Sequence, residues 1–394
     1  KIVEPVNSDF YDIRSVLTAE QEGKRQLVVD FMEREVRPIM NEYWEKGEFP
    51  QHIIPRVGEF MADYMDGEQY QYPAKDRLLS SIAFSLEMGR IEPSFSTFFG
   101  VHWGLAMPSI YMFGSEAQKA KWLPAMQRFE KIGSWALTEP EHGSDASMGL
   151  ATTAERVGDK WILNGQKKWS GNATFADVNV IWARDTADGQ VKGFLVELGQ
   201  PGYTVEKLEG KIAKRAVENV LITLEYCEVL EENRLPGANS FRDVSKQLAI
   251  ARGGVSWEAI GVAMGAYEKA LEYANQRMQF GKPITSFQMV QERFVEMLGH
   301  ITAMQGMMLR LAQLVERDGY ISHERASLAK AYCSARMREV VAMARAVMGG
   351  NGILLEYEVA RFFADAEAVY SYEGTYEMNV LITGRAITGQ SAFV

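Results

Sequence analysis

The chain contains 394 residues, of which 47% are hydrophobic, and its net charge is −10. This length favours two or three packed units, and the mixture of acidic and basic residues along the whole chain disfavours a nucleic-acid partner. No apolar run approaches the roughly 20 residues that span a bilayer, so we expect no membrane span. The two cysteines, Cys227 and Cys333, lie far apart without zinc-ligand spacing. We therefore expect no disulfide framework and no metal site.

The first ten residues, Lys1 to Phe10, lack the apolar segment of a secretory signal. No other targeting signal is visible in the sequence. We therefore expect a soluble protein of the bacterial cytoplasm or of an organelle matrix.

Helical patterns dominate the first third of the chain. Thr18 to Gln21 has the composition of a capping box. Apolar residues then recur at near-helical spacing, at Val28, Met32, Val36 and Ile39, with an interruption expected near Pro38. Ser80 to Met88 and Glu116 to Phe129 form two further segments of this kind. These patterns predict an N-terminal helical domain over residues 1–131.

Residues 132–240 show the pattern of a β domain. Short runs rich in Val, Ile, Thr and Trp are separated here by turn-forming pairs, which are Gly158-Asp159, Asn164-Gly165 and Asp188-Gly189. The clearest predicted strands are Val178 to Ala183, Gly193 to Leu198 and Val220 to Tyr226. We expect them to form an antiparallel sheet.

Helical periodicity returns after Pro236-Gly237 and continues to the end of the chain. Helices are predicted at about residues 241–275, 287–317, 322–348 and 374–388. A C-terminal helical domain over residues 241–394 follows, and the fold class is α+β with a large excess of helix.

Two segments of the predicted β domain are suited to binding a flat or phosphorylated ligand. In Trp135 to Asp145, hydroxyls and glycines lie where helix gives way to strand, and backbone N–H groups in such a turn can hold a phosphate or the edge of a flavin. An ordinary interdomain turn is the simpler alternative. Trp169, in Lys168 to Asn172, could stack on an isoalloxazine ring, although a tryptophan in a sheet is more often a core residue.

Two glycine-containing segments lie near predicted helix ends. Arg277 to Pro283, with Gln288 beyond it, could present a guanidinium group to a pyrophosphate, or Gly281 could simply end a helix. Gly349 to Gly352 lacks the lysine of a phosphate-binding loop and the spacing of a dinucleotide fingerprint. We interpret it as a helix break that permits close approach of the backbone.

Glu373 is the candidate catalytic residue. It is a lone carboxylate in the sequence Tyr370-Ser-Tyr-Glu-Gly374, and a carboxylate among apolar groups has a raised pKa that suits a general base. The alternative is an acidic residue placed at a helix N-terminus, where the helix dipole favours it.

Five segments together carry a resemblance to a known family. They are Trp135-Ala-Leu-Thr-Glu-Pro with Gly143-Ser-Asp, Asn164-Gly-Gln-Lys-Lys-Trp, Arg277-Met-Gln-Phe-Gly, Gly349-Gly-Asn-Gly and Tyr372-Glu-Gly-Thr. In this order and spacing, the chain resembles the acyl-CoA dehydrogenase and acyl-CoA oxidase superfamily over essentially its whole length. It is most similar there to the glutaryl-CoA dehydrogenase group and to plant-type short-chain acyl-CoA oxidases. The resemblance implies a helical domain, a central β domain and a C-terminal four-helix bundle.

The resemblance also implies a reaction, a cofactor and partners. FAD would accept a hydride at N5 from Cβ of an acyl-CoA thioester while Glu373 removes the α-proton, and the product would be the trans-2-enoyl-CoA. The thioester carbonyl would bond the FAD ribityl hydroxyl and the Glu373 N–H, which stabilises the enolate charge. Electrons would pass to an electron-transferring flavoprotein (Etf) or to O2. A homotetramer or dimer is implied, because some FAD contacts would come from a neighbouring subunit.

The site residues that the resemblance implies fall into three sets. The flavin would be lined by one chain at Trp135, Leu137, Thr138, Gly143, Ser144, Trp169, Ser170, Gly171, Thr375 and Glu377. The neighbouring subunit would contribute Arg277, Gln279, Phe280, Gln288, Ala346, Val347, Gly349 and Gly350. The substrate would contact Ser96, Ser144, Arg252 and Gly374.

Three departures from the family pattern bear on the substrate and the electron acceptor. Glutaryl enzymes have an arginine where this chain has Ser96, and without it a buried second carboxylate would lack its charge partner. Gly171 replaces the usual threonine, as in the plant oxidases, which makes oxygen reactivity an alternative. Residues 61–76 depart from the usual glycine-rich turn at the substrate entrance. A protein that keeps the fold without catalysis is the remaining alternative, and the intact Glu373 argues against it.

Overall fold

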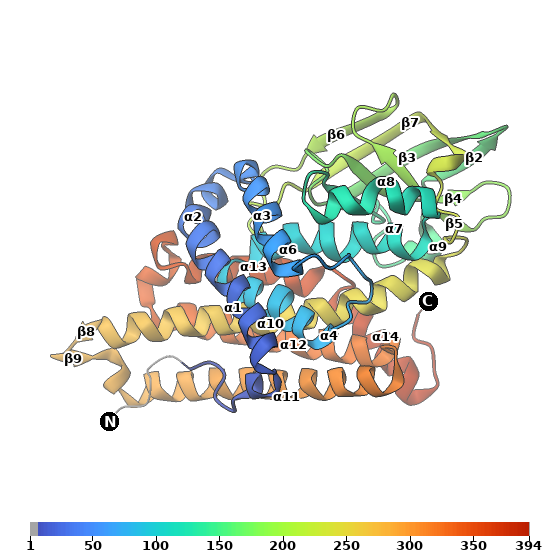
Figure 1. The fold of residues 1–394 in the computed structure, drawn as a ribbon. Helices are drawn as coiled ribbons and strands as arrows, with labels where there is room; N and C mark the ends of the chain where they lie inside the picture. The colour runs from blue at the N-terminus through green and yellow to red at the C-terminus, as the bar shows by residue number, and fades with distance from the viewer. Residues whose placement is uncertain (1–6, 394) are drawn as a thin grey trace.

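The computed structural model describes residues 7–393. Figure 1 shows the β domain at one end of the molecule and the long helices α10, α11 and α12 running side by side along the opposite face, with the N-terminal helices packed on them. Part of the Lys1 to Phe10 stretch, residues 1–6, lies outside the described residues. Within the described part, none of the helices combines the length and the apolar character that a bilayer crossing requires.

The N-terminal domain consists of short helices, as predicted. They are α1 (Ala19–Phe31), α2 (Arg37–Lys46), α3 (Ile54–Met65), α4 (Arg77–Ser80), α5 (Met88–Ile91), α6 (Pro93–Phe99), α7 (Met107–Phe113) and α8 (Glu116–Gln127). The capping box at Thr18 is confirmed, because its hydroxyl accepts from the Gln21 N–H at 3.2 Å and its own N–H donates to the Gln21 side chain at 2.7 Å. The interruption is a π-helical segment, Met32–Val36, which precedes Pro38 in the first turn of α2. Proline has no N–H to continue the α-helical ladder, which accounts for the break.

The β domain holds one seven-stranded sheet and a short helix, α9 (Ala146–Gly149). The strands are β1 (Gly133–Ala136), β2 (Thr153–Val157), β3 (Lys160–Ser170), β4 (Val178–Asp185), β5 (Val191–Glu197), β6 (Tyr203–Lys207) and β7 (Val220–Leu230). The sheet is mainly antiparallel, as predicted, but β1 and β2 both pair with β4 in parallel.

One predicted turn is wrong. The pairs at 158–159 and 188–189 do connect neighbouring strands, whereas Asn164-Gly165 lies inside β3, where the register with β7 shifts. Gly165 has φ 142°, and a Cβ there would lie 2.7 Å from the Cα of Thr152. The glycine therefore permits close approach of a neighbouring backbone within the sheet, which is the other structural use of a strand glycine.

The C-terminal domain is a helical bundle. Its helices are α10 (Phe241–Gln276), α11 (Gln288–Asp318), α12 (His323–Val347), α13 (Val359–Ser371) and α14 (Tyr376–Thr388), and a two-stranded hairpin, β8 (Met278–Gln279) and β9 (Lys282–Pro283), joins α10 to α11. The four predicted helices are confirmed to within two residues, and α13 was not predicted. Met297, Met304 and Met337 are fully buried between the helices, where their flexible side chains fill the core.

Contacts between the domains fix the base of the sheet against the helices. The Gly133 N–H donates to Nδ1 of His102 at 3.0 Å, and the Asn172 side chain donates to the Phe98 carbonyl at 3.0 Å. Burial lowers the pKa of His102 to about 4, so the imidazole is neutral and can accept. α10 packs very closely against the N-terminal segment that carries Leu86, because a Cβ added to Gly261 would collide with the Leu86 carbonyl. The start of β1 and the face of α10 are thereby held in fixed relation.

Candidate active site

Glu373 lies in the short turn between α13 and α14. Its backbone has φ 54°, and Gly374 follows at 82°. For a residue with a side chain, a left-handed conformation of this kind costs about 1–3 kcal/mol and persists only where the surroundings hold it. The carboxylate atom Oε2 is buried, and it has no hydrogen-bond partner among the described residues. An acceptor of this kind is available to a ligand.

The electrostatic surroundings of Glu373 favour a general base. Burial raises the pKa of Glu373 above its ordinary value, the positive charges of Arg252 and Lys330 oppose this effect, and Glu258 adds to it. Arg252, on α10, donates from Nε to the Glu373 carbonyl at 3.4 Å, and its Nη1 is buried with no partner in the described part of the chain. A half-buried acid and a half-buried cation therefore each place in this region one buried atom that has no hydrogen-bond partner within residues 7–393.

Two further side chains hold the turn from the C-terminal side. Lys330, on α12, donates to the carbonyls of Tyr370 at 2.7 Å and Gly374 at 2.8 Å. The buried Asn379 side chain also donates to the Gly374 carbonyl, at 2.8 Å. The hydroxyl of Thr375 accepts from the Met378 N–H at 3.3 Å and so caps α14. Gly374 and Thr375 thus lie beside Glu373, and Glu377 is exposed in the first turn of α14.

The segments around Trp135 and Trp169 lie side by side. The Lys168 N–H donates to the Thr138 carbonyl at 2.8 Å, and the Ser134 hydroxyl donates to the Gly171 carbonyl at 2.7 Å. Leu137 and Gly171 are buried, Trp135 is half-buried, and Gly143 and Ser144 are exposed in the turn before α9. The structure therefore joins the two predicted flavin segments of one chain.

A buried ion pair lies beneath these segments. Lys167 Nζ donates to Glu139 at 2.7 Å and to the Leu137 carbonyl at 3.1 Å. The Glu139 carboxylate also accepts from the N–H groups of Ala151 at 2.6 Å and Thr152 at 2.9 Å. The lysine side chain is 0% exposed and the glutamate 4%. The pair consequently fixes the path of the backbone on both sides of Thr138.

The exposed surface of this region fits a flat ring with a polar edge. The Trp169 side chain is 52% exposed, and its backbone has φ 75°. The neighbouring Ser170 hydroxyl is buried without a partner among the described residues. An exposed aromatic face can stack on a flat ring, and a buried hydroxyl without a protein partner can bond a ligand.

The remaining predicted flavin residues lie elsewhere in the chain. Figure 1 shows the β8–β9 hairpin, which carries Gln279, projecting from the end of the bundle that is far from the β domain. The loop after α12 reaches the same end, where Asn351 donates to the Tyr273 hydroxyl at 2.9 Å. Exposed residues of this group are Arg277, Gln279, Phe280, Gln288, Ala346, Gly349 and Gly350, and Val347 is half-buried. One chain therefore does not bring them to Trp169 or Glu373.

Sequence reasoning missed Lys330, Lys167 and Glu139. Lys330 lies between Ala326 and Cys333 on the buried face of α12. Lys167 is in phase with the buried Trp161 and Leu163 of β3. A lysine in phase with core residues must find a partner, so each was detectable as an irregularity, although its partner was not.

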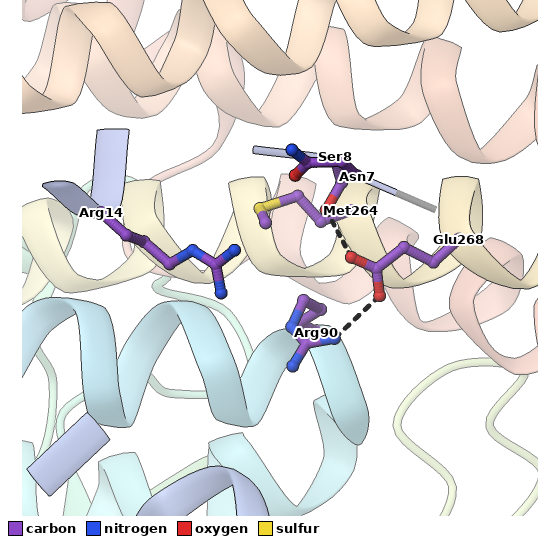
Figure 2. A pocket seen from close by; sticks show the side chains of 6 residues that line it. All are labelled: Asn7, Ser8, Arg14, Arg90, Met264 and Glu268. Atoms are coloured by element: carbon purple, nitrogen blue, oxygen red, sulfur yellow. Dashed lines mark hydrogen bonds and ion pairs between the residues drawn. The ribbon is translucent and has the colours of Figure 1, made fainter. Parts of the chain in front are cut away.

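A separate hollow lies between the start of the described chain, α5 and α10 (Figure 2). It has a volume of about 170 Å³ and is lined by Asn7, Ser8, Arg14, Arg90, Met264 and Glu268. Its two arginines are already paired, Arg14 with Asp9 at 2.9 Å and Arg90 with Glu87 at 2.6 Å and Glu268 at 2.8 Å. The hollow is polar but has balanced charges, and it is distinct from the Glu373 region.

Three family models match successive parts of the chain. The N-terminal domain of acyl-CoA dehydrogenase matches residues 18–130, its middle domain matches residues 134–227 and its C-terminal domain matches residues 241–388. Together they cover most of the chain.

Individual proteins agree with these models over nearly full length. An acyl-CoA dehydrogenase of Bacillus subtilis is 32% identical over 95% of this chain and 99% of its own. The CarC subunit of the caffeyl-CoA reductase–Etf complex of Acetobacterium woodii is 32% identical over 91% of this chain and 95% of its own. Among solved structures, a glutaryl-CoA dehydrogenase from Mycobacterium smegmatis in complex with FADH2 superposes with a TM-score of 0.92, at 30% identity, over 98% of both chains. The chain belongs to the acyl-CoA dehydrogenase family.

Proposed function

We propose that this family member is an FAD-dependent oxidoreductase that converts an acyl-CoA thioester to the trans-2-enoyl-CoA, with Glu373 as the base that removes the α-proton. The buried, unpartnered Oε2 of Glu373 is the observation that carries this proposal. FAD, when bound, accepts the hydrogen that leaves Cβ together with its electron pair. The similar glutaryl-CoA dehydrogenase structure, which is a complex with FADH2, supports FAD as the cofactor.

Glu373 is suited to this step by its surroundings. The α-C–H bond breaks as the proton moves to the carboxylate, which becomes neutral while negative charge develops on the thioester. A buried carboxylate with a raised pKa gains from that change, because the neutral form tolerates burial better than the charged form. The positive charges of Arg252 and Lys330 act in the opposite direction and favour the ionised form that accepts the proton.

We propose that the flavin is held by two copies of the chain. Thr138, Trp169 and Ser170 would contact the ring from one copy, and the second copy would contribute Arg277, Gln279 and Phe280. The hairpin of this second set is exposed, and the Phe280 side chain is 91% exposed. An aromatic side chain on a projecting hairpin gains stability when another surface covers it. A homotetramer, or a dimer, would supply that surface.

The proposed substrate is a monocarboxylic acyl chain. Ser96 is buried in α6 and uncharged. A second carboxylate placed against it would be desolvated without a cation, which is strongly unfavourable. Glutaryl-CoA is therefore disfavoured, although a glutaryl-CoA dehydrogenase is among the similar structures.

We propose Etf as the electron acceptor, since the similar CarC protein is a subunit of a caffeyl-CoA reductase–Etf complex. Transfer to O2 is the alternative that Gly171 leaves open. A Cβ at this position would lie 3.3 Å from a Val217 methyl and 3.4 Å from a Val101 methyl, so the site tolerates little added volume.

A panel of butyryl-, isovaleryl- and glutaryl-CoA tests the proposal. The purified protein is assayed once with Etf and once for peroxide release, and the enoyl-CoA product is identified by mass. We expect bound FAD, product from a monocarboxylic substrate and electron flow to Etf. Peroxide release at the same rate would assign the oxidase instead, and a colourless protein with no product would refute both.

A further inference from the structure

We propose that Glu258 and Lys214 form a buried ion pair that positions the base Glu373 through the hydroxyl group of Tyr372. This inference rests on the proposed function, because it concerns how Glu373 is held for the α-proton. It adds two positioning residues, Lys214 and Glu258, that lie outside the five segments that carry the family resemblance.

The link between Tyr372 and Glu258 is direct. The Tyr372 hydroxyl donates to Oε2 of Glu258 at 2.6 Å, across 114 residues of sequence. Burial, followed by the charge of Glu258, raises the pKa of Tyr372 well above its ordinary value, so the hydroxyl keeps its proton and remains a donor. A short bond from a neutral donor to a buried carboxylate is among the stronger hydrogen bonds in proteins.

The other oxygen of Glu258 binds a lysine from a different domain. Lys214 Nζ lies 2.8 Å from Oε1, and the two side chains are 3% and 8% exposed. Lys214 also donates from Nζ to the Pro93 carbonyl, and its backbone N–H donates to Asp365 at 2.5 Å. The pair therefore joins the β6–β7 connection to α10, to the start of α6 and to α13.

None of the other contacts described for the turn holds the Tyr372 side chain, although Lys330 also donates to the Tyr370 carbonyl on the same side of Glu373. Lys330 and Asn379 hold Gly374, which follows Glu373, and Arg252 contacts the Glu373 carbonyl. Tyr372 precedes Glu373 and ends α13 with extended backbone. With its hydroxyl fixed to Glu258, the left-handed Glu373 is held from both sides, as a strained conformation requires.

Glu258 has a second, electrostatic effect that can be separated from the first. The charged and titratable groups that face Glu373 are Arg252 and Glu258 on α10, Lys330 on α12 and Tyr72 before α4. Removing the negative charge of Glu258 would make ionised Glu373 more favourable. Removing the Tyr372 hydroxyl would leave that charge in place and break only the positional link.

The experiment compares two variants of the full-length holoenzyme with a matched control. Tyr372→Phe removes the hydroxyl. Glu258→Gln combined with Lys214→Met removes both charges but keeps an amide oxygen that can accept from Tyr372. The control, Tyr203→Phe, removes another buried tyrosine hydroxyl, which accepts from Asn179 at 2.9 Å within the β domain. Each is mixed anaerobically with butyryl-CoA, and the rate constant of flavin bleaching is measured against pH.

We expect Tyr372→Phe to lower the rate constant by on the order of ten- to a hundred-fold, with the half-saturating substrate concentration little changed, because misplacement by a fraction of an ångström weakens proton transfer. Its pH midpoint should stay where it is. The charge-free double variant should lose part of the rate, because the amide oxygen that accepts from Tyr372 is no longer anchored by Lys214, and its midpoint should move to lower pH. Tyr203→Phe should match the parent.

Two results would overturn the inference. Bleaching of Tyr372→Phe at the parent rate, or a midpoint in the double variant that does not move, shows that the network has no bearing on the base. If the parent itself does not bleach with any acyl-CoA, the proposed function fails as well, which distinguishes the two failures.

Discussion

Replacing Lys167 with Met tests whether the buried pair beneath Thr138 supports flavin binding. The substitution keeps the length of the side chain and removes its charge. Glu139 would then retain the two N–H donors of Ala151 and Thr152 but lose its only cation in the described contacts. The Leu137 carbonyl would also lose its donor.

The expected loss of stability is large. Removing one partner of a buried ion pair typically costs about 3–5 kcal/mol, because the remaining charge is uncompensated. At roughly 2–4 °C for each kcal/mol in domains of 150–250 residues, Tm should fall by at least about 6 °C. Because both partners are almost fully buried, solvent screening cannot reduce this loss much.

Scanning calorimetry of the holoenzyme and the FAD content after gel filtration are the two readouts. Lys160→Met is the matched control on the same strand, because its pair with Glu228 at 2.7 Å is exposed and screened by solvent, so its removal should leave Tm nearly unchanged. We expect Lys167→Met to lose both stability and FAD, and Lys167→Met with Glu139→Gln to recover part of each. A Lys167→Met protein that melts with the control and keeps its FAD would refute the reasoning.

Three further outcomes are expected. The rate constant of flavin reduction, measured by stopped flow, should rise with pH through the raised pKa of Glu373 and then level off, because only the ionised carboxylate accepts the α-proton. A rate constant that falls over that pH interval would exclude this base. Arg277→Ala should release FAD and weaken the oligomer in sedimentation experiments, while the isolated chain stays folded by circular dichroism; retention of both FAD and assembly would contradict the two-copy site. Gly261→Ala should destabilise the protein by about 1–3 kcal/mol, because its Cβ meets the Leu86 carbonyl. The control Gly299→Ala, with open space around it, should be neutral or stabilising by up to about 1 kcal/mol. Equal melting temperatures of the two variants would show that α10 can move.

Local patterns predicted the elements well where one residue type has one structural use. Thr18 could only be read as a cap, and the four long C-terminal helices follow from their periodicity and end signals. Asn164-Gly165 was wrong because glycine serves both hairpin turns and close approach of strands, and the choice depends on Thr152, which only the folded sheet places there. The helix α13 was overlooked, although Val359, Phe362, Ala366 and Val369 recur at helical spacing and form its buried face.

The site was predictable only as a set of separate segments. Family resemblance pointed to Glu373, Trp169 and Arg277, and the structure adds that the β domain, which carries Trp169, lies at the opposite end of the fold from the β8–β9 hairpin, which follows Arg277. The partners that hold Glu373 come from α10 and α12, and the Tyr372–Glu258 bond spans 114 residues. Contacts at that separation depend on how the domains pack, which single-segment patterns do not contain.

Anaerobic flavin reduction by an acyl-CoA in the Glu373→Gln variant tests the central claim most directly. Glutamine keeps the size of the side chain and the left-handed turn but cannot accept the α-proton. We expect the variant to bind FAD and the thioester as the parent does and to bleach at least about a hundred-fold more slowly, in line with the roughly 10²–10⁴-fold contribution of a positioned general base. Bleaching at the parent rate would contradict the account, because the α-proton would then have another acceptor.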